Sequence, residues 1–319
     1  MVRRARVRRQ EGEIALRTNH YPDFFVVGAP KCGTTALHSY LGQHPRIFMP
    51  SQKEVHHFGS DLAGLPATLS PYQHRRLFDD ASEASIVGET CIWALYSKNA
   101  AREIKAACPD AKIVILLRDP IDLAHALHSE YLYQGIEDIS RFDRALRAEP
   151  DRQRGRRLPC RDLYPASIYL YRQIVSFSDQ VERYFAEFRP ERIHIILFEE
   201  FKRNLSSAYQ NLLAFLDVDP VFSPSFPLIN ANKRLRSARL QHWLRNPRKT
   251  VPRLARRVFP FPNARRRAAE AAARWNVVQA PRPPLSSALR AWLSQELAPD
   301  IQRLGQRLGR DLASVWTVK

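Results

Sequence analysis

Short apolar runs alternate with amphipathic stretches along most of this chain. The runs are the length of buried strands, and they cover residues 24–27, 86–89, 112–117 and 193–198. Helical spacing of apolar residues fills the intervals, over 36–43, 99–107, from Pro120 onward, 167–188 and 206–216. This alternation predicts an α/β fold, a doubly wound parallel sheet flanked by helices in a single domain.

Outside this pattern the sequence predicts less regular structure. Residues 149–165 are polar, rich in arginine and interrupted by proline, which indicates a surface loop. Residues 286–297 and 300–308 read as two terminal helices on either side of Pro299. We expect a basic N-terminal tail over 1–21 and a domain over 22–319, with a basic, partly irregular segment at 233–280.

The charge is unevenly placed. The formal net charge is +18 over 319 residues, and residues 233–274 contain fourteen Lys or Arg with Glu270 as the single acid. Such a field favours anionic partners: a phosphorylated cofactor, an acidic polymer or anionic lipid. The charge comes without an aromatic RNA-binding motif or a DNA-binding helix pattern, so we expect no nucleic acid partner.

Targeting and metal signals are missing from the sequence. We find no apolar run long enough to span a bilayer and no apolar segment of a secretory signal. Cys32, Cys91, Cys108 and Cys160 are scattered without metal-ligand spacing. We therefore expect a cytoplasmic protein with reduced thiols and no metal.

The first apolar run leads into a P-loop-like sequence at 28–35. Gly28, Gly33 and Thr35 stand at the offsets of a phosphate-binding loop, in which backbone N–H groups and a helix N-terminus hold phosphates. A nucleotide hydrolase has lysine directly after the second glycine, whereas here Thr34 follows and the lysine is Lys31.

The residues that follow the later apolar runs indicate whether the site would bind a metal ion. Arg118 follows the 112–117 run where a magnesium-binding acid would stand, and a cation there suits a bare phosphate. Glu199 and Glu200 do follow the 193–198 run, so a small-molecule kinase using ATP–Mg²⁺ stays open as an alternative.

Several segments in order resemble the sulfotransferases that use 3′-phosphoadenosine 5′-phosphosulfate (PAPS), particularly the branch of bacterial, heparan-sulfate and tyrosylprotein enzymes. The similar segments are 29–35 (APKCGTT), 53–58 (KEVHHF), 88–90 (GET), 117–120 (LRDP), 198–201 (FEEF), 230–237 (NANKRLRS) and 309–316. The resemblance implies a sulfotransferase domain over 22–319, with PAPS as co-substrate and no metal.

The resemblance also implies roles for individual residues. It implies cofactor contacts from the loop residues Pro30, Lys31, Cys32, Gly33, Thr34 and Thr35. Lys31 would stabilise the leaving group, and Arg118 would pair with the 3′-phosphate. Glu54 would be the general base, with Lys53 beside it and His56 as the rival base.

The 3′-phosphate motif departs from the family pattern. Ala126 stands where the family has serine, and Leu123 where a second arginine is frequent. Ser129 or His125 could substitute from the same helix. The late loop could also compensate, through Lys233, Arg234 and Arg236.

The acceptor is left open by the sequence. We expect a hydroxyl, or an amine, of a small-molecule, lipid or saccharide acceptor. The basic segment 233–274 would suit an anionic acceptor or peripheral contact with an anionic membrane, and Phe261, Trp243 and Trp275 are either stacking or packing residues. A non-catalytic basic module that binds nucleotides or polyanions is the second alternative.

Overall fold

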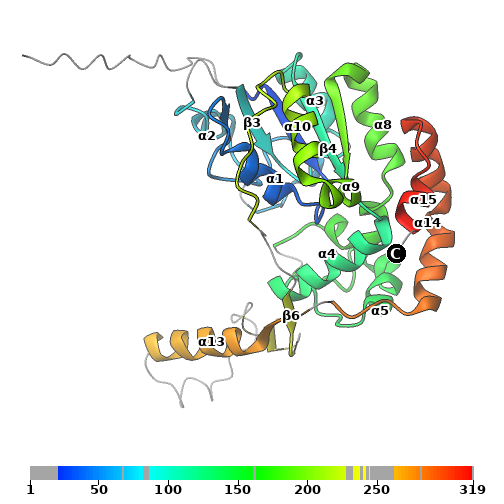
Figure 1. Cartoon of the computed structure of the whole chain (residues 1–319). Coiled ribbons are helices and arrows are strands. Elements are labelled where there is room, and N and C mark those ends of the chain that lie inside the picture. The colour runs from blue at the N-terminus through cyan, green and yellow to red at the C-terminus, as the bar shows by residue number, and fades with distance from the viewer. Residues whose placement is uncertain are drawn as a thin grey trace, which may run out of the picture.

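The central element is a parallel five-stranded sheet (Figure 1). The computed structural model describes residues 21–66, 68–81, 86–160, 163–227, 233–237, 240, 241, 244, 262–280 and 282–317. The strands are β1 (Phe24–Gly28), β2 (Ile47–Phe48), β3 (Ile86–Thr90), β4 (Lys112–Leu117) and β5 (Ile193–Leu197), in the spatial order β2-β3-β1-β4-β5. With β1 in the centre and helices on both faces, the predicted doubly wound, single-domain fold is confirmed.

The helices follow the strands in the expected alternation. The α-helices are α1 (Thr34–Leu41), α2 (Pro71–Arg76), α3 (Ala100–Ala107), α4 (Pro120–Gln134), α5 (Phe142–Arg147), α6 (Glu149–Gln153), α7 (Tyr171–Ile174), α8 (Ser178–Glu187), α9 (Phe198–Arg203), α10 (Leu205–Phe215), α13 (Pro262–Asn276), α14 (Ser287–Leu308) and α15 (Leu312–Thr317). Short 3₁₀ turns are η1 (Ser60–Leu62), η2 (Ala166–Tyr169) and η3 (Pro190–Arg192). Asp119 caps α4 through the N–H groups of Ile121 and Asp122, and Pro120 opens its first turn as expected.

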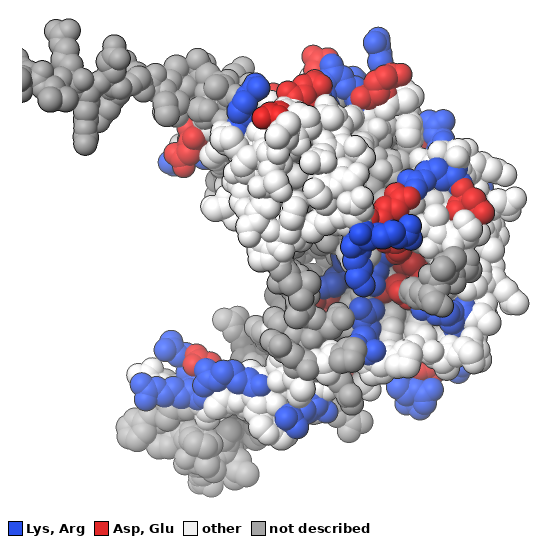
Figure 2. Space-filling view, viewed as in Figure 1, with Lys and Arg blue, Asp and Glu red and all other residues white. Residues whose placement is uncertain are grey.

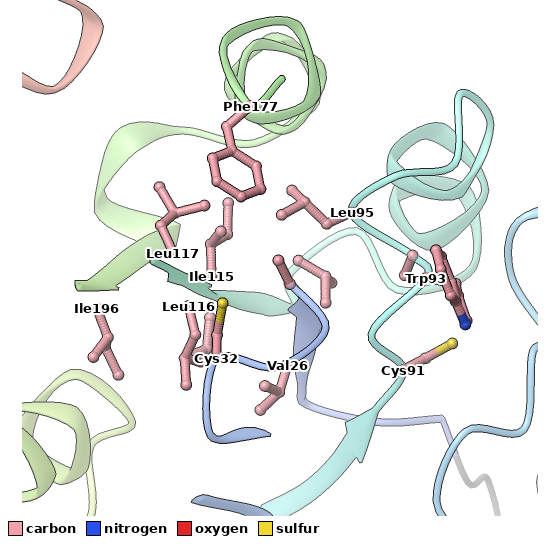
Figure 3. Close-up of a cluster of buried hydrophobic side chains, with 14 of the residues drawn as sticks. Val26, Cys32, Cys91, Trp93, Leu95, Ile115, Leu116, Leu117, Phe177 and Ile196 are labelled. Atoms are coloured by element: carbon pink, nitrogen blue, oxygen red, sulfur yellow. The ribbon is translucent and has the colours of Figure 1, made fainter. Parts of the chain in front are cut away.

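The core lies on both sides of β4. Residues 113–117 are fully buried, because helices cover both faces of the sheet. In Figure 3, Phe177 points toward Ile115 and Leu117 on one side, while Cys32 and Leu116 lie on the other. β1 and β3 also approach closely, since a Cβ on Gly88 would lie 2.1 Å from the Phe24 ring.

The prediction of a surface loop over 149–165 is wrong for residues 149–153. Residues 149–153 form α6, and Arg152 is fully buried there. Its guanidinium donates to both carboxylate oxygens of Glu137, at 2.7 and 2.8 Å, and Tyr171 donates to the same carboxylate at 2.7 Å. The polar composition of this run predicts a solvated segment, whereas one of its arginines is neutralised inside the protein.

Two predicted helices have different boundaries. The stretch 167–188 divides into η2, α7 and α8, because the Asp300 carboxylate accepts the N–H groups of Phe177 and Ser178 and starts α8 there. The two helices expected over 286–297 and 300–308 are one helix, α14, with Pro299 inside it. Buried Leu293, Leu297 and Leu304 hold α14 against the domain across that proline.

The basic segment is partly helical. β6 (Lys233–Leu235) pairs antiparallel with β7 (Val277–Gln279), and α13 extends away from the sheet (Figure 1). Figure 2 shows Lys and Arg side chains along α13, where Arg266, Arg267 and Arg274 are exposed. The tail at 1–20 and residues 245–261, with Phe261, lie outside the described residues, as does Trp243. No helix in the described ranges combines the length and apolar character that a bilayer crossing requires.

Candidate active site

The loop between β1 and α1 has the form of a phosphate-binding loop. Gly33 has φ +85° at the N-cap of α1, so the first backbone N–H groups of that helix face the loop. Gly28 is needed for close approach, because a Cβ there would lie 2.7 Å from the Leu95 Cβ and 2.9 Å from the Ile92 carbonyl oxygen. The predicted loop is therefore built as the sequence indicated.

The loop side chains divide between core and solvent. Pro30, Cys32 and Thr34 are buried, and burial raises the pKa of the Cys32 thiol far above its usual range. Thr35 is exposed. Cys32 would thus reach a phosphate through its backbone N–H, whereas Pro30 has no N–H to offer, and the Thr35 hydroxyl stays accessible.

Lys31 has a partner that the sequence did not indicate. Its amine lies 2.9 Å from a carboxylate oxygen of Glu130 on α4, and both side chains are 31% exposed. Gln134 donates to the other Glu130 oxygen at 2.8 Å. Glu130 holds the lysine at the mouth of the loop, and a surface ion pair of this kind is weak enough to exchange for a ligand anion.

Arg118 joins the end of β4 to the loop. Its guanidinium donates to the Lys31 carbonyl oxygen at 3.0 Å and lies 4.7 Å from the centre of the Phe198 ring. The sheet brings these residues together, since β4 pairs directly with β1 and β5. Arg118 therefore lies beside the phosphate loop, and its contact with a 3′-phosphate stays a prediction.

A second arginine, Arg282, lies close to Arg118. Its guanidinium donates to the Asp122 carbonyl oxygen at 3.2 Å, at the start of α4. Burial and the neighbouring charge of Arg118 lower the pKa of Arg282 to about 10. An anion bound near both guanidinium groups would relieve this unfavourable effect of one charge on the other. Arg282 gave no signal in the sequence, because it stands alone between prolines far from any motif.

The residues expected to replace the family serine have other contacts. Ala126 is buried in α4, and the Ser129 hydroxyl donates to the His125 carbonyl oxygen at 2.9 Å. The His125 ring stacks on Phe142, and burial together with the charge of Arg282 lowers its pKa to about 4. Arg282 is therefore a better candidate for the missing 3′-phosphate contact than Ser129 or His125.

The late basic loop is described only in part by the structure. β6 packs against α4, but the side chains of Lys233 and Arg234 lie outside what the structure describes. Arg236 donates to the Trp275 carbonyl oxygen at 2.9 Å and covers that indole ring at 5.1 Å. Arg236 and Trp275 thus bind each other at the base of α13.

Glu54 is connected to the phosphate loop through a single residue, Ile92. One of its carboxylate oxygens accepts the Ile92 N–H at 2.9 Å, and the other pairs with the Lys53 amine. The carbonyl of the same Ile92 is the atom that approaches Gly28. Glu54 has φ +60° and His56 has φ +47°, a conformation that costs energy for residues with a side chain. The fold therefore holds both candidate bases in fixed orientations.

His56 differs from Glu54 in its surroundings. Its Nδ1 lies 3.3 Å from the Cys91 sulfur, and burial together with the charge of Lys53 lowers the histidine pKa to about 4. An imidazole with that pKa is neutral at physiological pH but a weak proton acceptor. We keep Glu54 as the candidate base on its position, because its carboxylate is partly exposed beside Lys53.

The acids at the strand ends already have partners. The Asp119 side chain caps α4 and lies 3.5 Å from Arg290. Glu199 accepts the Asp119 N–H at 3.1 Å and the Trp316 indole N–H at 3.2 Å, and Glu200 pairs with Arg310. These carboxylates stabilise the C-terminal helices, which argues against a magnesium site of the kinase type.

Comparison with known proteins agrees with this site. The model of the sulfotransferase domain family matches residues 21–224. A crystal structure of a sulfotransferase from Alicyclobacillus acidocaldarius shares 28% identity, with a TM-score of 0.69 over 94% of this chain and 100% of that one.

Two curated relatives match over shorter regions. Membrane-associated sulfotransferase kil1 of Dictyostelium discoideum is 32% identical over 32% of this chain and 21% of its own length. Carbohydrate sulfotransferase 15 of Mus musculus is 27% identical over 38% of this chain and 29% of its own length. The chain thus covers less than a third of either relative. With the family match spanning the sheet, the phosphate loop and Arg118, this chain belongs to the sulfotransferase domain family.

Proposed function

We propose that this protein transfers a sulfuryl group from PAPS to a hydroxyl, or an amine, of an acceptor. The observation that carries the proposal is the contact between Arg118 and the Lys31 carbonyl, because it puts a second cation at a phosphate loop that already holds a lysine. PAPS has anionic groups at both ends of its ribose, and the site offers cations in two places to match.

The chain would hold PAPS through its backbone and its arginines. The N–H groups at the start of α1 would bind the 5′-phosphate, and the Thr35 hydroxyl would add a contact. Arg118 and Arg282 would share the 3′-phosphate, which replaces the repulsion between them by two attractions. Bound PAPS supplies the activated sulfuryl group, and no metal is required because cations of the chain neutralise the charge.

The transfer itself would be an in-line displacement. The acceptor oxygen forms a bond to sulfur while the bond from sulfur to the 5′-phosphate oxygen breaks, and the hydroxyl proton goes to the Glu54 carboxylate. Lys31 exchanges Glu130 for the departing oxygen and stabilises its charge. The products are a sulfate ester and adenosine 3′,5′-bisphosphate.

The acceptor we favour is a saccharide hydroxyl. A relative is named for carbohydrate, and exposed arginines along α13 would attract an acidic or already sulfated chain. A lipid or other small-molecule hydroxyl remains within the proposal. The four free cysteines, all buried, fit a reducing compartment such as the cytoplasm.

Calorimetry with adenosine 3′,5′-bisphosphate in metal-free buffer tests the proposal. We expect micromolar binding by the wild type and its loss in Arg118→Ala, with Arg274→Ala on α13 as the control that binds normally. PAPS labelled on sulfur then tests transfer to a set of saccharides. Tighter binding of ATP–Mg²⁺ would support the kinase instead, and binding without any transfer would support the non-catalytic module.

A further inference from the structure

Three side chains near the loop converge without a role in holding the cofactor. Ligand atoms of Glu54, His56 and Cys91 all lie within 4.8 Å of one another. They come from two separate segments, one after Pro50 and one after β3, that meet beside the phosphate loop. A carboxylate, an imidazole and a thiol together form the ligand set of a borderline-soft divalent metal, above all zinc.

The spacing agrees with a shared ion. In a tetrahedral zinc site, bonds of about 2.0 Å to nitrogen and 2.3 Å to sulfur put those two atoms about 3.5 Å apart. The observed separation between His56 Nδ1 and Cys91 Sγ is 3.3 Å. The two ligands thus stand nearly as an ion would hold them, and the Glu54 carboxylate can complete a three-ligand site with one open position.

We propose that Glu54, His56 and Cys91 bind Zn²⁺, and that the bound ion blocks sulfuryl transfer by taking the Glu54 carboxylate. Binding breaks the ion pair of Glu54 with Lys53 and releases the Cys91 thiol proton to solvent. The zinc site is defined by geometry alone, whereas the blocking effect rests on the function proposed above.

The surroundings set the strength of binding. His56 already points its Nδ1 at the Cys91 sulfur, so this nitrogen needs little movement to reach a shared ion. Cys91 is buried close to the Glu54 carboxylate, and its thiol must lose a proton before it can bind the ion. Because the ion must displace that proton and also face the Lys53 amine, we expect micromolar rather than tighter binding.

Cobalt spectroscopy on the untagged, chelator-treated full chain tests the site without reference to turnover. Co²⁺ should give a near-ultraviolet thiolate charge-transfer band and the visible bands of tetrahedral cobalt, and one equivalent of Zn²⁺ should remove them. Cys91→Ser should abolish the thiolate band, and Glu54→Gln should weaken Zn²⁺ binding by at least about tenfold. Cys108→Ser is the matched control, since Cys108 is also a buried free cysteine. A missing band, or one that persists in Cys91→Ser, overturns the site.

Turnover with labelled PAPS tests the blocking effect. Micromolar Zn²⁺ should inhibit the wild type, a chelator should restore the rate, and Cys91→Ser should resist inhibition. Equal inhibition of the wild type and Cys91→Ser would place the inhibitory ion elsewhere, and wild type unaffected by bound zinc would overturn the blocking effect. If the cobalt band is present but neither adenosine 3′,5′-bisphosphate binding nor transfer is found, the zinc site stands and the proposed function fails.

Discussion

Replacing Arg282 by glutamine should weaken the binding of adenosine 3′,5′-bisphosphate without lowering the stability of the fold. In the unliganded protein Arg282 lies partly dry beside Arg118, and the two charges oppose each other. With a 3′-phosphate between them, both charges become favourable. Glutamine removes one charge but can still donate to the Asp122 carbonyl oxygen. We therefore expect weaker binding of adenosine 3′,5′-bisphosphate by a protein that is at least as stable as the wild type.

The size of each effect follows from the contacts. A hydrogen bond from a charged group is worth about 1.5–3 kcal/mol, so the dissociation constant should rise by roughly 10- to 150-fold. The repulsion relieved in the unliganded protein is smaller, about 1 kcal/mol, because solvent reaches this half-buried side chain and screens it.

Two ligands and one control variant make the test specific. Calorimetry with adenosine 5′-phosphate should show little difference between Arg282→Gln and wild type, because that ligand has no 3′-phosphate. Arg274→Gln, which removes an exposed charge on α13, should leave both affinities unchanged. An equal loss for both ligands, or a large drop in melting temperature, would refute our assignment of Arg282.

Three further predictions follow from the site and the core. Glu54→Gln should lower the transfer rate by about 10²- to 10⁴-fold in labelled-PAPS assays, with adenosine 3′,5′-bisphosphate affinity unchanged; an unaltered rate would show that another group is the base. Arg152→Met should destabilise the fold by about 3–5 kcal/mol in chemical unfolding, because Glu137 keeps a buried charge without its partner, and adding Glu137→Gln should recover part of this loss. The free energy of unfolding should be highest above about pH 6.5 and should decline as the pH falls toward 4. Burial lowers the pKa of three histidines to about 4, so below pH 6.5 the unfolded chain takes up more protons than the folded one, and each histidine costs at most about 1.4 kcal/mol of stability per pH unit. A urea midpoint that stays constant over this range would contradict the prediction. These histidines are His38, His56 and His125.

The parts of the fold that could be predicted from sequence are those that depend on residues close together along the chain. The run 112–117 is apolar throughout and ends at a charged residue, so both β4 and the position of Arg118 were readable. The burial of Arg152 could not be predicted, because its neighbours in sequence are polar and its partner Glu137 lies on another segment. Pro299 suggested a helix end, but three buried leucines hold α14 together across it.

The candidate site shows the same division. The loop at 28–35 and Glu54 stand in recognisable segments. Glu130 and Arg282 do not, because each becomes relevant only when α4 folds back over the phosphate loop. A sequence pattern shows only the neighbours of a residue along the chain. The contacts of Glu130 and Arg282 are with residues that are distant in sequence and close in space.

The central place of β1 has a consequence for how the chain is made. β1 is made before both of its neighbours, since Phe24 pairs with Gly88 on one side and Lys112 on the other. Until the ribosome has released the chain beyond β4, the apolar strand FFVVG lacks at least one of its two neighbours and keeps an unpaired edge. We expect nascent chains that stop before Leu117 to aggregate or to require a chaperone, because the strand that leads into the phosphate loop is made before both of the strands that cover its edges.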